Sequence, residues 1–159
     1  MDDLLDELRR CKHLFLETLT EPAVNQLRVV LAEGTLGAPV GADDLVSEAE
    51  PERSLLVGAR PIVQSADSTR FELIWRSYIG YSVLNESYTA DEASHAEVLQ
   101  LGRRFIEYAS SRYLEHLARA SIATRECPGP FRHWRICCEG HTIDVASQGA
   151  PVIRRIAPR

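Results

Sequence analysis

The stretch Phe131-Arg-His-Trp-Arg-Ile-Cys-Cys-Glu-Gly-His-Thr-Ile-Asp-Val-Ala146 carries the clearest structural signal in the chain. Two strand-like runs flank Glu139-Gly140, a pair that suits a two-residue hairpin turn. In the register that this turn sets, the facing pairs are Cys138 with His141, Ile136 with Ile143 and Trp134 with Val145. Arg135 then meets Asp144 on the opposite face. One register therefore gives both an apolar face and a cross-strand ion pair, and it predicts an antiparallel hairpin.

A second β signal lies upstream, within residues 70–84. Most odd positions of Phe71-Glu-Leu-Ile-Trp-Arg-Ser-Tyr-Ile-Gly-Tyr-Ser-Val83 are apolar, whereas the even positions include Glu72 and Arg76. This alternation is typical of an antiparallel strand that is covered on one face. The run is longer than a usual strand, so we expect Gly80 to mark a bulge or bend. Shorter strands are predicted at residues 25–32 and 60–65.

Two segments show the spacing of amphipathic helices. Across residues 2–19, apolar side chains recur at intervals of three or four, and Pro22 ends the pattern. A second stripe runs through residues 91–123, and Thr89 and Glu92 before it fit a capping box. The sequence therefore predicts an N-terminal helix and a long central helix or helix pair.

These elements predict a single α+β domain spanning residues 1–159. The chain is 45% hydrophobic and 26% charged, which is typical of one ordinary soluble domain of this length. We expect one antiparallel sheet of about five strands, covered on one face by the N-terminal and central helices. The remaining parts are expected to be irregular: an acidic loop with Gly and Pro at 34–58 and a C-terminal tail at 147–159.

The charge balance excludes some functional classes. The formal net charge is −5, which argues against a general nucleic-acid binder, since such proteins depend on clustered Lys and Arg. No run approaches the roughly 18 consecutive apolar residues of a membrane helix. The N-terminus is acidic and no apolar signal core follows it, which predicts a cytoplasmic protein with no membrane partner.

Charge is also unevenly distributed along the chain. Residues 1–100 contain 18 acids and 8 bases, whereas residues 101–159 contain 5 acids and 10 bases. The simpler interpretation is two solvated faces or pairing between the halves. The functional interpretation is a bipolar surface that steers a charged partner toward one side.

Cysteine and histidine side chains near the hairpin are candidate metal ligands. A structural zinc site needs four nitrogen or sulfur ligands that converge on one point. In the predicted hairpin, His133 and Cys137 point to one face, whereas Cys138 and His141 point to the other. We therefore predict no metal site and no cofactor, and in a reducing compartment we expect free thiols. The four cysteines are Cys11, Cys127, Cys137 and Cys138.

One segment offers a candidate catalytic pair. Asn85-Glu-Ser-Tyr88 follows the long strand, where Glu86 would be a general base and His95 its partner in a small hydrolase-like enzyme. The simpler interpretation, which we favour, is a turn with a solvated carboxylate. The sequence thus leans away from an enzyme.

The favoured hypothesis is a small interaction protein that acts by stoichiometric binding. An acidic chain without a catalytic motif suits a bacterial immunity protein or antitoxin that neutralises a basic toxin. A homodimeric regulatory or structural domain remains an alternative. Five acids in the 34–58 loop are the predicted contacts with a basic protein partner: Asp43, Asp44, Glu48, Glu50 and Glu52.

Overall fold

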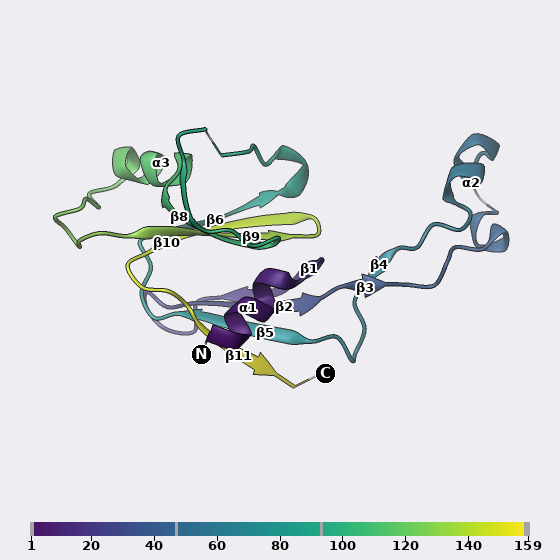
Figure 1. Cartoon of the computed structure of the whole chain (residues 1–159), viewed down its shortest axis with the longest axis horizontal. Coiled ribbons are helices and arrows are strands. Elements are labelled where there is room, and N and C mark those ends of the chain that lie inside the picture. The colour runs from purple at the N-terminus through teal and green to yellow at the C-terminus, as the bar shows by residue number, and fades with distance from the viewer. Residues whose placement is uncertain (1, 47, 93, 158–159) are drawn as a thin grey trace.

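The computed structural model describes residues 2–46, 48–92 and 94–157 (Figure 1). The helices are α1 (Asp2–Arg10), α2 (Glu50–Leu56) and α3 (Arg112–Ala120), with two 3-10 turns, η1 (Ala42–Leu45) and η2 (Glu86–Tyr88). The strands are β1 (Leu14–Thr20), β2 (Leu27–Glu33), β3 (Thr35–Leu36), β4 (Ile62–Val63), β5 (Arg70–Trp75), β6 (Gly80–Asn85), β7 (Glu97–Gln100), β8 (Phe105–Ser110), β9 (Arg132–Cys138), β10 (His141–Ser147) and β11 (Val152–Ile156). The chain is therefore α+β, with more strand than the sequence predicted.

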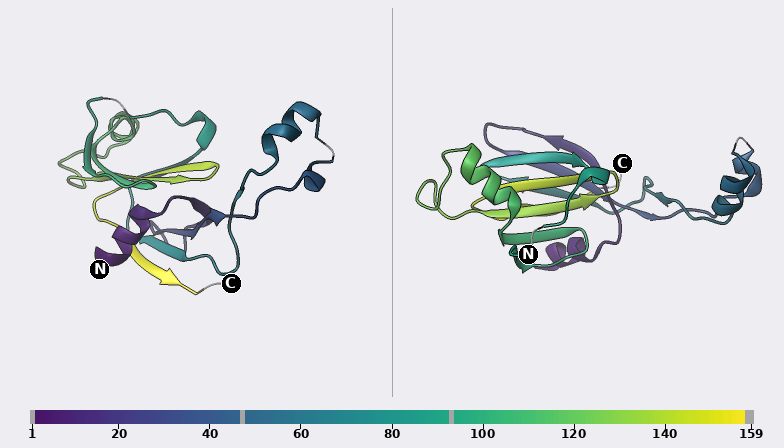
Figure 2. Two further views of the ribbon diagram at one scale, coloured as in Figure 1. Left: turned by 45° about the vertical axis from the view of Figure 1, so that its right-hand side comes forward. Right: turned by 90° about the horizontal axis from the view of Figure 1, so that it is seen from above.

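Two antiparallel sheets stack face to face and form the body of the molecule (Figure 1). One sheet has the order β1-β2-β5-β11, and the other has the order β6-β10-β9-β8-β7. α1 contacts both β8 and β11 and so bridges one side of the two layers, whereas α3 packs against β9 on the outer face (Figure 2). The prediction of one sheet with both helices on a single face was wrong.

The core lies between the two sheets. Trp75 of the first sheet and Trp134 of the second meet edge to face, with ring centroids 6.3 Å apart. Around them, the fully buried apolar side chains come from both sheets and from α1. The largest of these are Phe71, Phe105, Leu8, Leu14, Leu27, Leu31, Leu73, Ile136 and Ile143. Each such side chain stabilises the fold by roughly 1.5–3 kcal/mol through its removal from water.

The structure confirms the predicted hairpin in β9 and β10. The paired residues are His141 with Cys138, Ile143 with Ile136, Asp144 with Arg135 and Val145 with Trp134. Gly140 has a φ of 80°, as the left-handed position of a tight turn requires. Because a slip of one residue would turn every side chain to the wrong face, the apolar pattern holds this register.

The predicted helix over residues 2–19 is only half correct. α1 ends at Arg10, and the chain continues as β1, which pairs with β2. The pairing shifts between Leu16 and Thr18, so a bulge interrupts the two-residue alternation of this strand. That interruption left a spacing of apolar residues that resembles a helix.

The predicted long helix over residues 91–123 was also wrong. The segment contains β7 and β8, and among its described residues only the nine of α3 are helical. The helix cap is Ser111, whose Oγ accepts a hydrogen bond from the Leu114 N–H, rather than Thr89. Gly102 lies in the turn between the two strands. A side chain does not fit there, because a Cβ would lie 2.4 Å from the carbonyl oxygen of Phe105.

Other boundaries also changed. The predicted strand over 70–84 is divided into β5 and β6, which belong to different sheets. The segment expected at 60–65 is reduced to β4, which pairs with β3 outside both sheets. The expected tail at 147–159 contains β11, which pairs with β5; residues 158–159 of that tail lie outside the described residues.

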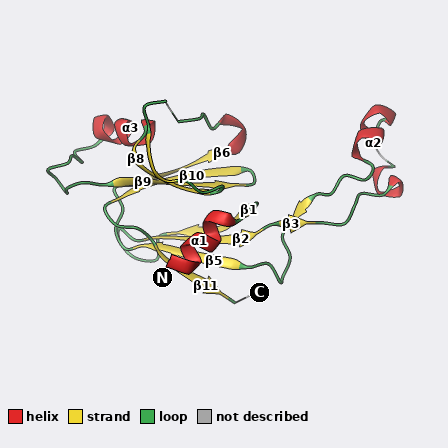
Figure 3. Ribbon diagram, viewed as in Figure 1, coloured by secondary structure: helices red, strands yellow, loops and turns green. Residues whose placement is uncertain are grey.

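The segment expected to be an acidic loop forms most of a projecting arm, which we define as residues 35–63. β3 and β4 make a two-stranded ribbon, and η1 and α2 lie at its far end (Figure 3). The ribbon continues beyond its strands through backbone hydrogen bonds of 2.8 Å from Val40 N–H to Ala59 C=O and 2.9 Å from Gly58 N–H to Val40 C=O. Neither η1 nor α2 contains a buried residue.

Candidate functional site

The five acids predicted to face a partner all lie at the far end of the arm. Each of them is solvent-exposed. Asp44 accepts a hydrogen bond of 2.9 Å from the Gly41 N–H, and Glu50 lies 3.5 Å from the guanidinium of Arg53. Within the described ranges, the other three carboxylates make no ion pair: Asp43, Glu48 and Glu52. The arm therefore presents a surface of largely uncompensated negative charge.

Apolar side chains are exposed on the same arm. Leu55 is 81% exposed and Val46 is 73% exposed. Single exposed apolar residues are ordinary, whereas the arm carries several of them. The large exposed apolar residues of the arm are Leu36, Val46, Leu55, Leu56, Val57 and Val63.

The residues of the alternative catalytic pair have separate partners. Oε2 of Glu86 accepts a hydrogen bond of 2.8 Å from the Gly140 N–H, which ties η2 to the β9–β10 turn. Nε2 of His95 lies 2.8 Å from the carboxylate of Glu115 on α3, and both side chains are exposed. Glu86 and His95 share no hydrogen bond within the described part of the chain, so their arrangement is that of surface contacts.

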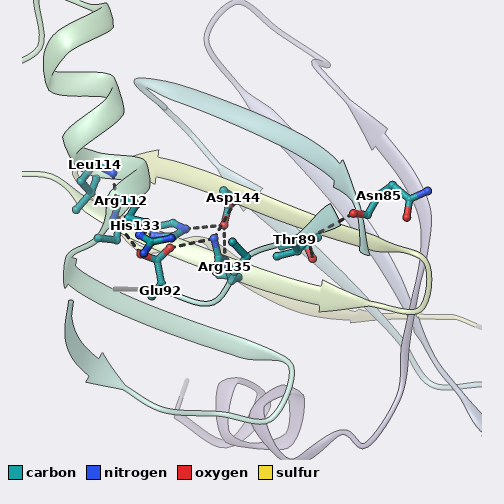
Figure 4. A network of polar contacts seen from close by, with 11 residues as sticks. Asn85, Thr89, Glu92, Arg112, Leu114, His133, Arg135 and Asp144 are labelled. Atoms are coloured by element: carbon teal, nitrogen blue, oxygen red, sulfur yellow. Dashed lines mark hydrogen bonds and ion pairs between the residues drawn. The ribbon is translucent and has the colours of Figure 1, made fainter. Parts of the chain in front are cut away.

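A buried polar network occupies the outer face of the second sheet, beneath α3 (Figure 4). Oδ1 of Asp144 accepts hydrogen bonds from Nε of Arg135 and Nε2 of His133, each at 2.7 Å. Nδ1 of His133 lies 2.8 Å from Oγ of Ser111. A carboxylate oxygen of Glu92 lies 3.0 Å from the Arg135 guanidinium. The network thus joins β9, β10, the start of α3 and the segment before β7.

Two side chains of this network fix the first turn of α3. Oγ of Ser111 accepts the Leu114 N–H at 3.2 Å, and the other carboxylate oxygen of Glu92 accepts the Arg112 N–H at 2.9 Å. Both contacts satisfy backbone donors that have no partner inside a helix. The negative charge of Glu92 also suits the positive end of the helix dipole.

The pair at the centre of the network remains charged. Burial by itself would raise the pKa of Asp144, but the hydrogen bonds and charges of His133 and Arg135 hold it below its ordinary value. Burial would likewise lower the pKa of Arg135, and the carboxylates of Asp144 and Glu92 raise it instead. Partnered charges of this kind are the form in which proteins tolerate ionised groups away from water.

Ser111, His133 and Asp144 form a hydrogen-bonded chain, but its geometry is not that of a nucleophilic site. Ser111 is 1% exposed, and its Oγ already accepts a helix N–H. The imidazole directs Nδ1 to the hydroxyl and Nε2 to the carboxylate, which reverses the usual order of a catalytic triad. The Arg112 N–H that could stabilise an oxyanion is occupied by Glu92. The arrangement therefore anchors α3 on the sheet.

The cysteines are free, and two of them lie in the core. Burial raises the pKa of Cys11 and of Cys138 to about 12. Burial also raises the pKa of Cys137, despite the opposing charges of Arg135 and Arg104. Thiols in this state are protonated at neutral pH and are poor nucleophiles. Among the described residues, no group of three or more His, Cys, Asp or Glu side chains could hold a metal ion.

Sequence reasoning found one contact of the network and missed the others. The Arg135–Asp144 pair followed from the hairpin register. Ser111 and Glu92 were missed because the predicted helix over residues 91–123 spans the segment between them. The available signal was the serine directly before Arg112-Tyr-Leu-Glu115, which is a helix-cap pattern.

Comparison of the chain with protein family models, with curated proteins and with solved structures gave no match. None of the helices within the described residues is long and apolar enough to cross a membrane.

Proposed function

We propose that this protein acts by stoichiometric binding of a basic protein, with the far end of the arm as its contact surface. The specific form of the proposal is a bacterial immunity protein or antitoxin that neutralises a basic toxin in the cytoplasm. The observation that carries the proposal is the arm itself: it projects from the body, buries no residue of η1 or α2, and exposes both acids and large apolar side chains.

The two kinds of side chain on the arm have different roles in such a complex. Carboxylates raise the rate of association with a basic partner, because complementary charge steers the encounter. Apolar side chains that become buried slow dissociation, because each Å² of apolar surface removed from water stabilises the complex by roughly 25 cal/mol before the costs of association. A ribbon held by backbone hydrogen bonds presents both kinds in a fixed arrangement, which lowers the entropic cost of binding.

The proposal is tested with two variants of equal net charge. The arm variant carries Asp43→Asn, Asp44→Asn, Glu48→Gln, Glu50→Gln and Glu52→Gln. The matched control neutralises five exposed acids of the rest of the chain that have no side-chain partner among the described residues: Asp3→Asn, Asp67→Asn, Asp91→Asn, Glu97→Gln and Glu126→Gln. A partner captured from source cells with the wild-type protein is purified and mixed with each variant in a stopped-flow instrument.

We expect the arm variant to associate about ten-fold more slowly at low salt, and the difference to shrink at high salt, where charges are screened. The control variant should associate at nearly the wild-type rate. Equal rates for the arm variant and the wild type at both salt concentrations would remove the arm from the interface and contradict the proposal.

A further inference from the structure

A basic groove lies on the body, away from the arm. It has a volume of about 650 Å³ and lies between the end of α1 and the turn that joins β7 to β8. Arg10 and Arg103 line it, are solvent-exposed, and make no ion pair within the described ranges. The one acid in the lining, Asp6, lies 3.6 Å from Arg9 and is already paired. The groove therefore offers two free positive charges.

The floor of the groove is fixed by close packing. The Arg103 N–H donates a hydrogen bond of 3.0 Å to the carbonyl oxygen of Arg9, which joins the turn to α1. Gly102 lies so close to α1 that a Cβ there would be 2.9 Å from Cγ of Arg9. A ligand would thus meet a preformed surface and lose little entropy in ordering it.

An exposed apolar side chain lines the same groove, and others lie on the strand that leads to it. β7 is the last strand of its sheet and pairs with β8, and no other strand of the described residues pairs with its outer edge. Leu101, directly after β7, is 78% exposed and lines the groove, and Val98 and Leu99 on the strand are partly exposed. The groove thus combines cations with apolar contacts, whereas the arm combines acids with apolar contacts.

We propose that the groove binds the arm of a second copy of this chain, so that the free protein is a reciprocal dimer. The far end of the arm and α1 lie apart in every view (Figures 1 and 2), and the hydrogen-bonded ribbon holds them apart within one chain. A two-fold axis would place each arm in the groove of the other copy and close the assembly at two chains.

This inference deepens the proposed function without needing a known partner. In the dimer, the groove of one copy would cover the arm of the other until a basic partner competes for the same carboxylates. The two ideas fail separately, because the dimer is tested with the purified protein alone. A wild-type protein that is monomeric would contradict the dimer, but the arm could still bind a basic partner in the stopped-flow experiment.

The test measures oligomeric state by sedimentation velocity from about 1 to about 200 µM, at about 0.05 M and about 0.5 M NaCl. The wild-type chain should sediment as a dimer at low salt, and its dissociation constant should rise about ten-fold or more at high salt. The groove variant, Arg10→Glu with Arg103→Glu, should be monomeric. A matched control reverses two exposed arginines elsewhere, Arg119→Glu with Arg154→Glu, and should remain dimeric.

Charge reversal on both surfaces gives a sharper result. A second variant, the lysine-arm variant, carries Asp43→Lys, Asp44→Lys, Glu50→Lys and Glu52→Lys. It should also be monomeric alone, since its basic arm would meet a basic groove. Mixed in equal amounts, the lysine-arm and groove variants should form a heterodimer. The lysine arm then meets the glutamate-substituted groove, and the unchanged acidic arm meets the unchanged basic groove. Circular dichroism spectra and melting curves establish that each variant is folded.

Three outcomes would overturn the proposal. The first is a wild-type protein that stays monomeric over the whole concentration range, which would leave the groove to an acidic segment of another protein. The second is a dimer that the groove variant does not weaken. The third is a mixture of the folded lysine-arm and groove variants that contains no heterodimer.

Discussion

The guanidinium of Arg135 and the carboxylate of Asp144 lie directly across from each other on β9 and β10, with 2.7 Å between Nε and Oδ1. The Asp144 side chain is 3% exposed and that of Arg135 is 10% exposed. A pair this deeply buried holds the outer face of the second sheet to the segments that cover it. Removal of the Asp144 carboxylate leaves the buried Arg135 guanidinium with Glu92 as its remaining ion-pair partner among the described residues.

We expect Asp144→Asn to lower the free energy of unfolding by about 2–3 kcal/mol, because Arg135 would keep its charge in a buried site with Glu92 as its remaining counter-charge, and His133 would lose its carboxylate partner. Urea unfolding at neutral pH measures the loss. Asp67→Asn, at an exposed position, is the control and should change stability by less than about 0.5 kcal/mol. A loss for Asp144→Asn as small as that of the control would show that the pair contributes nothing net.

The same carboxylate predicts a dependence on acid. The pKa of Asp144 in the folded protein lies below its ordinary value of 3.8, so its contribution is complete above that value. The contribution is lost as the pH falls from there through the lower folded pKa. The difference in unfolding free energy between wild type and Asp144→Asn should therefore be constant from pH 7 to about pH 5 and shrink below about pH 4. A difference that stays constant to about pH 2 would contradict this.

Ser111→Ala should destabilise the fold by about 2 kcal/mol. Loss of the helix cap costs about 1 kcal/mol, and the buried Nδ1 of His133 loses its hydrogen-bond partner. Ser111→Thr keeps the hydroxyl and should cost less. The control is Ser54→Ala on the exposed face of α2, with an expected change below about 0.5 kcal/mol. Equal urea midpoints for Ser111→Ala and Ser54→Ala would remove this role.

The two tryptophans should respond differently to substitution. Trp134→Ala should cost about 3–5 kcal/mol, since it opens a cavity between the sheets. Trp75→Phe should cost less than about 2 kcal/mol, because Nε1 of Trp75 is buried without a hydrogen-bond partner among the described residues and the phenyl ring removes this group. Either change should abolish the part of the near-ultraviolet circular dichroism that arises from the ring pair. Unfolding curves with equal losses would contradict the difference.

Replacement of residues 41–57 by an Asn-Gly turn should leave the stability of the body nearly unchanged. No residue of η1 or α2 is buried, so their removal takes no side chain from the core. The ribbon pairing of Val40 with Gly58 would continue into the new turn. We expect a melting temperature within a few degrees of wild type. A drop of more than about 10 °C would show that the arm supports the body.

Local patterns in the sequence specified the hairpin because its information lies within sixteen residues. The Glu139-Gly140 turn, the apolar alternation and the Arg135–Asp144 pair all require the same register. β1 was missed for the opposite reason: its bulge removes the alternation, and only pairing with β2 makes the segment a strand. The arm acids were placed on an exposed segment, although its ribbon and α2 were not foreseen.

The sequence by itself determined the hairpin register and the exposed position of the acidic cluster, since these follow from short-range pattern and charge. Tertiary structure alone decided that β5 and β6 enter different sheets, because alternation shows which face of a strand is buried but not which sheet receives it. It also decided the contacts of Ser111 and Glu92 with residues about 20 or more positions away. Such contacts form only when the two sheets pack and bring α3 onto β9, and no local pattern encodes that approach.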